Sequence, residues 1–151
     1  MEKRLKQESM RENPRIIVIT GAESTGKSAL TEQLAGHFGA PSVPEFAREY
    51  VENLHKPYEY PDVDKIARKQ MEEYHILQQS ESAFVFLDTW LIITKIWFDV
   101  VFGKFPPWLE AALQHSRVDL FLICHTDLPW VPDPVRENGG KQREILQQKY
   151  I

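Results

Sequence analysis

Cysteine and long apolar runs are scarce in this chain, and each shortage excludes a class of protein. A single cysteine, Cys124, leaves no partner for an internal disulfide and no basis for a cysteine-rich metal site. No apolar run is long enough to cross a membrane, and the first residues carry charges of both signs without the apolar centre of a signal peptide. These shortages favour a cytoplasmic protein without a membrane partner.

Positive charge is also in short supply. The formal net charge is −4 and there is no basic stripe, which argues against nucleic acid as the main partner, because that binding depends on neutralising phosphates. A small molecule is the expected partner, and an oligomer is possible. With 151 residues and 42% hydrophobic content, the chain can form one globular domain with its own core. We expect residues 1–14 to be a solvated lead-in ended by Pro14, and residues 15–151 to form the domain.

The sequence GAESTGKS carries the strongest functional signal. It matches the spacing of a phosphate-binding loop and stands between an apolar β-branched run and a helical pattern, which is the context that such a loop requires. Glycines let the backbone approach phosphates closely, and the helix that follows contributes its positive N-terminal end. We expect ATP to bind this whole loop, namely Gly21, Ala22, Glu23, Ser24, Thr25, Gly26, Lys27 and Ser28.

Individual residues of the loop have separate expected tasks. Lys27 can place its charge on the β and γ phosphates, and the hydroxyl of Ser28 can coordinate the Mg²⁺ that bridges them. Glu23 is unusual, because a carboxylate beside phosphates is unfavourable unless it points away. We expect Glu23 to face solvent or a basic partner.

Short apolar runs alternate with helical patterns along the rest of the chain, which predicts a doubly wound α/β fold with a parallel sheet. The expected strands are 16–20, 41–43, 83–87 and 118–124, and the expected helices are 29–38, 62–80 and 91–102. Ligands in such folds bind at the carboxyl ends of the strands. Residues that directly follow each run are therefore candidates for function.

Glu45 falls where the chain leaves the second run, within the sequence VPEFAREY. In one interpretation this is an ordinary helix start, where acids are favoured by the helix dipole. In the other it is a substrate-binding element that carries Glu45 as a general base, with Arg48 on the helical turn that follows. A carboxylate can take the proton of an attacking hydroxyl, although positioning matters more in a loose phosphoryl-transfer transition state.

Asp88 ends the third run, in the sequence FLDTW, which has the form of a Walker B strand. An aspartate at this position can hold Mg²⁺ together with Ser28 and lie beside the substrate. The alternative is that Asp88 caps the following helix. If Asp88 faces the metal, Thr89 is free to cap, and we also count Thr89 among the candidate substrate contacts.

The segment after the fourth run predicts a lid. Prolines stiffen its first half, a glycine pair offers a flexible turn, and Arg136 and Arg143 flank that turn. Arginines that close over the γ phosphate would neutralise developing charge and exclude water. The alternative is a proline-rich surface loop with solvated charges. Trp130, among the prolines, is a candidate substrate contact. The aromatic residues around the third helix are expected in the core, namely Trp90, Trp97, Phe98 and Phe102.

The motifs GAESTGKS, VPEFAREY, FLDT and DLPWVPDPVR, in this order, resemble the ribosylnicotinamide kinase domain of NadR-type proteins, which are often described as AAA domains. The resemblance implies an α/β, three-layer P-loop NTPase/kinase fold with a parallel sheet. It also implies transfer of the ATP γ phosphate to the 5′ hydroxyl of nicotinamide riboside, giving nicotinamide mononucleotide in NAD biosynthesis by salvage. It also implies that Glu45 and Arg48 face the nucleoside, that Asp88 belongs to the magnesium centre, and that Arg136 and Arg143 are lid residues.

The chain departs from this family at both ends. Bifunctional relatives carry an adenylyltransferase domain ahead of the kinase, and we predict no such activity here. Family members continue past the lid helix into a last strand, so we expect that strand to be missing and the fourth strand to expose apolar surface, with weak adenine binding or pairing with another chain as the result. The shortened end motivates an alternative function, a regulatory module that binds ATP without transferring phosphate. A motor-type AAA ATPase is disfavoured because there is no room for a helical second domain.

Overall fold

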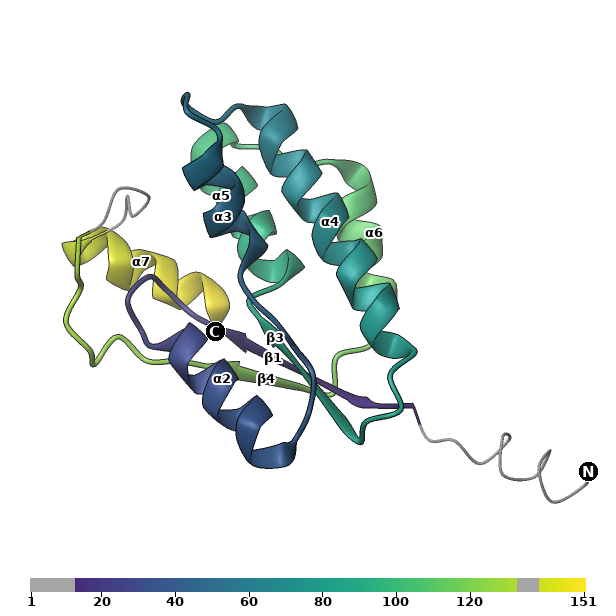
Figure 1. The fold of residues 1–151 in the computed structure, drawn as a ribbon. Coiled ribbons are helices and arrows are strands. Elements are labelled where there is room, and N and C mark those ends of the chain that lie inside the picture. Colours follow the sequence, from purple (N-terminus) through teal and green to yellow (C-terminus); the bar gives the residue numbers. More distant parts are fainter. Residues whose placement is uncertain (1–12, 133–138) are drawn as a thin grey trace, which may run out of the picture.

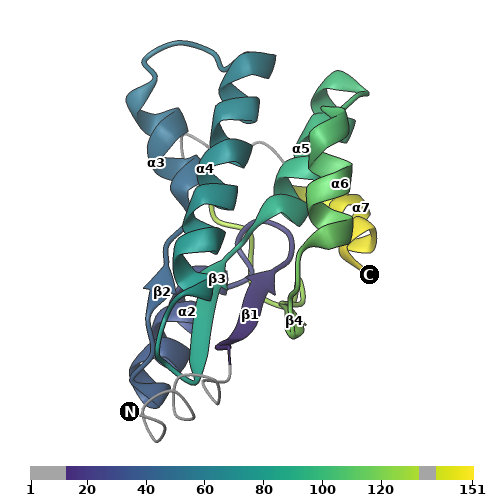
Figure 2. The same ribbon diagram turned by 90° about the vertical axis from the view of Figure 1, so that its right-hand side faces the viewer.

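A computed structural model describes residues 13–132 and 139–151, and its centre is a parallel sheet. The strands are β1 (Arg15–Thr20), β2 (Ser42–Val43), β3 (Phe84–Asp88) and β4 (Leu120–Ile123). They lie in the order β2-β3-β1-β4, which Figure 2 shows from one end of the sheet. All their pairings are parallel, which confirms the predicted α/β class.

Helices cover both faces of this sheet. They are α2 (Lys27–Phe38), α3 (Phe46–Asn53), α4 (Tyr60–Gln78), α5 (Leu91–Phe102), α6 (Pro107–His115) and α7 (Gly140–Tyr150). Figure 1 shows α2 on one face and α3 to α6 on the other, which gives the expected three layers. Among the described residues, no helix is both long and apolar enough to cross a bilayer.

The central strands determine where functional residues meet. β1 and β3 pair in register, with Ile19 opposite Asp88, and the N–H of Thr89 donates to the carbonyl of Ile19 at 2.8 Å. The two strands therefore end at the same level of the sheet. The phosphate loop (residues 21–28) leaves β1 at this level, directly beside Asp88 at the end of β3.

Alternate residues of β1 build two cores. Ile16 and Val18 belong to the larger core, under α4, α5 and α6, together with Trp90 and Phe98. Ile17 and Ile19 belong to the smaller core under α2. Successive side chains of β1 thus point to opposite faces of the sheet, and both faces are buried. This explains why residues 16–19 are all apolar.

The helix α6 was not predicted. Its sequence PPWLEAALQH begins with a proline in the first turn, which is a common helix start, and Leu109 is fully buried in the larger core. α5 ends at Gly103, whose φ of 66° is left-handed, and α6 begins four residues later at Pro107. No element was predicted for residues 103–117, although a proline in the first helical turn, such as Pro107, is a known start signal.

The strand β4 differs from the prediction of a buried strand. It lies at the edge of the described sheet, and Leu120, Phe121 and Ile123 are 48%, 42% and 39% exposed. These side chains are exposed on both faces, because Leu120 aligns with Ile17 and Phe121 aligns with Val18 on the opposite face. Exposed apolar surface on the fourth strand was expected, and pairing of its edge with another strand stays a prediction.

Candidate functional site

The phosphate loop connects β1 to α2 through left-handed backbone. Gly21, Ser24 and Gly26 have φ values of 134°, 56° and 81°. At Gly21 a side chain is excluded by contact as well, since a Cβ would lie 2.7 Å from the carbonyl oxygen of Cys124. The first glycine of the motif is therefore required by the closeness of the chain that leaves β4.

Lys27 points into the loop. It is the first residue of α2 and only 8% exposed, and its Nζ donates a hydrogen bond to the carbonyl of Ala22 at 2.8 Å. The hydroxyl of Thr25 donates to the same carbonyl at 2.8 Å. The ammonium group thus lies in the concave side of the loop, where the triphosphate is predicted to bind.

Ser28 and Asp88 are brought together as the sequence predicted. The hydroxyl of Ser28 donates a hydrogen bond to Oδ2 of Asp88, which is 5% exposed. The second carboxylate oxygen, Oδ1, is buried and has no hydrogen-bond partner among the described residues. A free, buried carboxylate oxygen beside a serine hydroxyl suits a cation that prefers oxygen ligands.

Asp88 does not cap α5, and neither does Thr89. The N-cap position of α5 is Trp90, and no side chain hydrogen-bonds there. Thr89 has a left-handed φ of 59° and a buried hydroxyl that finds no partner within the described part of the chain. The capping interpretation was therefore wrong for both residues, because Asp88 turns to Ser28. A substrate contact of Thr89 stays a prediction.

The charges in the site are only partly hydrated. Burial lowers the pKa of Lys27, and the nearby carboxylates of Glu45 and Asp88 oppose that shift. Burial raises the pKa of both Glu45 and Asp88, although Lys27 pulls both of them down. Each of these groups is thus less stable in its charged form than it would be in water. Perturbed pKa values of this kind are common at functional sites.

The donor set is compatible with Mg²⁺. In residues 13–132 and 139–151 there is no cluster of three or more histidine, cysteine, aspartate or glutamate side chains that could hold a metal ion alone. Mg²⁺ usually takes one or two protein oxygens and completes its shell with water and substrate phosphates. Ser28 and Asp88 provide one hydroxyl and one carboxylate, which fits that pattern.

One cavity of about 280 Å³ starts at the phosphate loop and extends between α3 and α5. Its polar end is lined by the loop, Glu45 and Arg48. Glu45 occupies the N-cap position of α3, and Arg48 pairs with Glu52 at 3.3 Å one turn later. The predicted substrate element therefore lies in the same cavity as the predicted ATP loop.

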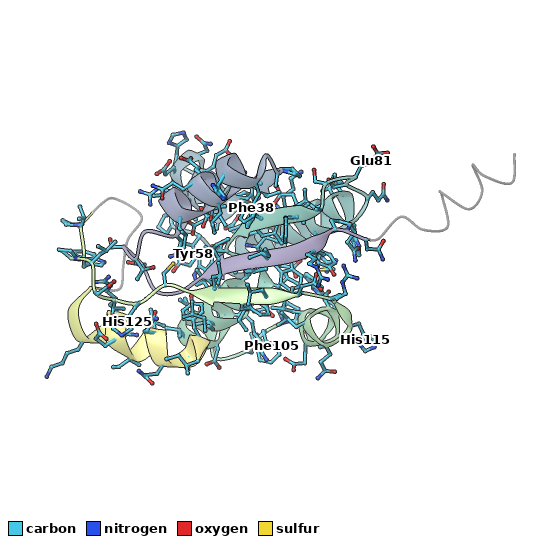
Figure 3. The ribbon with its side chains drawn as sticks, turned by 90° about the horizontal axis from the view of Figure 1, so that it is seen from below. Phe38, Tyr58, Glu81, Phe105, His115 and His125 are labelled. Atoms are coloured by element: carbon cyan, nitrogen blue, oxygen red, sulfur yellow. The ribbon has the colours of Figure 1, made fainter. Side chains whose placement is uncertain are left out.

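The other end of the cavity is apolar. α5 contributes one helical face, which includes the ring of Trp97. Tyr58, labelled in Figure 3, adds a second aromatic ring. The rings of Tyr58 and Trp97 meet edge to face, with centroids 4.8 Å apart. The core assignment holds for Trp90 but is incomplete for Trp97, which also lines the cavity. The lining residues of α5 are Ile93, Ile96, Trp97, Val100 and Val101.

The helix α7 closes the cavity with residues on one face. Arg143 is 5% exposed, its Nη2 donates to the carbonyl of Ser24 at 2.9 Å, and its Nε is buried without a partner among the described residues. Leu146 and Tyr150 line the cavity, and burial together with Glu45 raises the pKa of the Tyr150 phenol. Arg136 lies outside the described residues.

Gln147, on the same face of α7, was missed by the sequence reasoning. Its Oε1 accepts a hydrogen bond from the N–H of Ala22 at 2.9 Å, and its Nε2 donates to the carbonyl of Cys124 at 2.8 Å. The only signal in the sequence was its spacing of four residues from Arg143, which places both side chains on one helical face.

The chain that leaves β4 also contacts the phosphate loop. Figure 3 shows His125 beside α7, where the chain has just left the strand. Further on, Trp130 donates from its indole nitrogen to Glu23 at 3.2 Å, and the N–H of Val131 donates to the hydroxyl of Ser24 at 3.1 Å. Trp130 therefore lies against the loop, where it gives the unusual Glu23 a hydrogen-bond donor. Contact of Trp130 with substrate stays a prediction.

Comparisons with known proteins identify the family of this chain. Residues 16–151 match the model of the AAA domain family. The chain belongs to the AAA domain family. This AAA domain is also 30% identical to the trifunctional NAD biosynthesis/regulator protein NadR of Salmonella typhimurium. The alignment of 142 residues covers 91% of the chain and 35% of that relative. The NadR protein of Escherichia coli strain K12 is 30% identical over 130 residues, which covers 83% of the chain and 32% of that relative.

Solved structures show the same fold. NadR in complex with NR superposes on this AAA domain with a TM-score of 0.68 and 24% identity, over 81% of the chain and 40% of that structure. NadR in complex with NAD and AMP-PNP gives the same TM-score and identity, over 81% of the chain and 42% of that structure. The resemblance to NadR-type domains is confirmed. The chain spans about a third of the curated relatives' length, 35% and 32%.

Proposed function

We propose that the chain is an ATP-dependent kinase that transfers the γ-phosphoryl group to the 5′ hydroxyl of nicotinamide riboside. The observation that carries this proposal is the single cavity in which the phosphate loop, Glu45 and an apolar, aromatic wall meet. Its polar end suits a triphosphate and its apolar end suits a nucleoside base. The similarity to NadR, which has been solved with NR and with AMP-PNP, supports the same assignment.

The phosphate end has a defined set of roles. Lys27 places its charge on the β and γ phosphates, and the loop N–H groups surround them. Ser28 and Asp88 would hold Mg²⁺, which would supply positive charge to neutralise the phosphates. Arg143 adds positive charge from α7, and its Nε, which has no partner among the described residues, is available for a phosphate oxygen. We propose Arg136 as a second arginine of this kind.

The acceptor end centres on Glu45. The acceptor hydroxyl oxygen forms a bond to the γ phosphorus, the bond from that phosphorus to the β–γ bridging oxygen breaks, and ADP leaves. Glu45 accepts the proton of the hydroxyl, and its raised pKa makes it a better base than an ordinary carboxylate. Arg48 orients the ribose from the first turn of α3, and Thr89 and Trp130 are proposed as further contacts.

The acceptor is expected to be cationic. Nicotinamide riboside carries a positively charged ring, which an aromatic wall and nearby carboxylates favour over neutral bases. A buried group left without its partner costs about 1 to 3 kcal/mol, which corresponds to discrimination of roughly tenfold to a hundredfold. Uridine, cytidine and adenosine should therefore be poorer acceptors.

Mass spectrometry of nucleosides incubated with magnesium ATP tests the proposal directly. The expected result is one added phosphoryl group, highest catalytic efficiency with nicotinamide riboside, and ADP formation that depends on the nucleoside. Equal or better use of a neutral nucleoside would overturn the nicotinamide assignment and leave a nucleoside kinase. Nucleotide binding without turnover of any nucleoside would favour the regulatory module instead.

A further inference from the structure

Gln147 bridges two backbone segments at the place where β1 and β4 separate. Both polar atoms of its amide are used, by the N–H of Ala22 and the carbonyl of Cys124, and the side chain is only 3% exposed. Ala22 is 125 positions away along the chain, so this contact depends entirely on how α7 docks.

The bridge takes the place of a rung of the sheet. The last direct rung between the strands runs from the N–H of Cys124 to the carbonyl of Thr20, at 2.9 Å. In a parallel ladder with this register, the next rung would run from the N–H of Ala22 to the carbonyl of Cys124. The amide of Gln147 lies between these same two groups, accepting from one and donating to the other. A side-chain amide from α7 therefore continues the ladder after the strands diverge.

This rung lies at the first turn of the phosphate loop. Gly21, with its φ of 134°, precedes Ala22, and the left-handed Ser24 follows within the loop. The carbonyl of Ser24 is itself held by Arg143, one turn earlier on the same face of α7. The direction in which the loop leaves the sheet is thus fixed by α7 at two backbone positions, the N–H of Ala22 and the carbonyl of Ser24.

We propose that Gln147 is a positioning residue for the triphosphate. By holding the exit of the phosphate loop, it sets the loop N–H groups in the geometry that ATP requires, and it links nucleotide affinity to docking of α7. This inference rests on the ATP-binding part of the proposed function. It adds a residue outside the loop motif that acts on ATP and not on the acceptor.

Paired substitutions in α7 test the role. Gln147→Leu removes both hydrogen bonds at similar volume, whereas Gln147→Glu keeps the acceptor for Ala22 and loses the donor to Cys124. The matched control is Gln148→Leu, at an exposed position on the same helix. The measurements are the Kd for magnesium AMP-PNP, the KM values for ATP and for the acceptor, and thermal unfolding with and without AMP-PNP.

We expect Gln147→Leu to weaken nucleotide binding about tenfold, with at least as large a loss for Gln147→Glu, whose carboxylate would face the carbonyl of Cys124. We expect no loss for Gln148→Leu and an unchanged acceptor KM. Because stabilisation by a ligand grows with ln(1 + [L]/Kd), a tenfold weaker Kd should lower the stabilisation by AMP-PNP by up to about 1.4 kcal/mol. An unchanged Kd, or Tm values lowered equally with and without AMP-PNP, would overturn the inference and leave a structural role. If Gln147→Leu does not fold, the Kd of Gln147→Glu decides in the same way. A wild-type protein that binds AMP-PNP but phosphorylates no nucleoside would refute the kinase proposal, while the Kd comparison would still decide on Gln147.

Discussion

The hydroxyl of Ser28 donates a hydrogen bond to the carboxylate of Asp88, although the two residues are 60 positions apart. Ser28 lies in the first turn of α2 and Asp88 is the last residue of β3. The register of the two central strands is what makes them neighbours. Two oxygen ligands suited to Mg²⁺ are therefore in place before any ligand arrives.

Asp88→Asn should raise the magnesium concentration needed for half-maximal activity by about tenfold or more, because the amide keeps the shape of the carboxylate but loses its charge. A magnesium titration at saturating ATP measures this. Asp99→Asn, at an exposed aspartate that pairs with Lys149, is the matched control. An unchanged magnesium requirement would contradict the assignment of Asp88 as a magnesium ligand.

Lys27→Ala should lower kcat/KM by about 10²- to 10³-fold, the range for loss of one preorganised donor to the transition state. Because burial already lowers the pKa of Lys27, its charge does not stabilise the empty loop, and the Tm without ligand should stay nearly unchanged. Steady-state kinetics and thermal unfolding measure the two effects, with exposed Lys65→Ala as control. An equally large loss of stability without ligand would point to a structural role.

Glu45→Gln should raise the Tm at neutral pH and not in acid. The raised pKa of Glu45 means that the folded state prefers the protonated form, so wild-type stability falls as the pH rises from about 4.3, the ordinary value, through the raised one. Glutamine cannot ionise and avoids this loss. The gain should be about 2 to 4 °C for each 1 kcal/mol in a chain of this size.

Thermal unfolding of wild type and Glu45→Gln across the pH range checks this sign. The same variant should lose phosphoryl transfer and keep its Kd for AMP-PNP, since Glu45 serves the acceptor. A Tm difference that does not change with pH, or a loss of nucleotide affinity equal to that of Asp88→Asn, would show that the assignment of Glu45 is wrong.

Trp97→Leu should raise the acceptor KM by roughly twofold to tenfold and leave the ATP KM unchanged, since an aromatic contact is worth about 0.5 to 1.5 kcal/mol. Trp108→Leu is the control, because Trp108 packs against the larger core and does not line the cavity. An unchanged acceptor KM, or an equal rise for both variants, would contradict a role of Trp97 in acceptor binding.

Gly21→Ala and Gly36→Ala should shift stability in opposite directions. At Gly21 a Cβ would collide with the carbonyl of Cys124, and the φ of 134° is unfavourable for alanine. At Gly36, inside α2, a Cβ would meet nothing within 4 Å, so alanine should stabilise the helix by up to about 1 kcal/mol. Thermal unfolding measures both, and a loss of stability in Gly36→Ala would contradict the structure of α2.

The parts of the fold that could be predicted are those whose sequence pattern lies within a few neighbouring residues. The loop spacing, the apolar run of β1 and the helical periodicity of α5 each lie within one short window, and these elements were found where they were predicted. Asp88 was found because it follows such a run directly. Ser28 was found from the loop motif, and its closeness to Asp88 could be inferred because parallel strands end at one edge of a sheet.

The parts that were missed depend on contacts between distant segments. Nothing near Gln147 in the sequence indicates that its amide joins Ala22 to Cys124, because that depends on the docking of α7. The apolar spacing of α5 could not tell which face meets the core, so Trp97 was not separated from Trp90. The exposure of β4 follows from its place at the edge of the described sheet, which a single strand's sequence does not encode.

The order of the strands has a consequence for how the protein folds. β1 and β3 are adjacent in the sheet, but α2, β2, α3 and α4 lie between them in the sequence. Contacts of such long sequence separation form late, because the intervening chain must first lose its conformational freedom. The pair of Ser28 and Asp88 can form only after this crossover has closed. Nucleotide binding should therefore report completed folding, and ATP should slow the unfolding of the finished domain without speeding its early collapse.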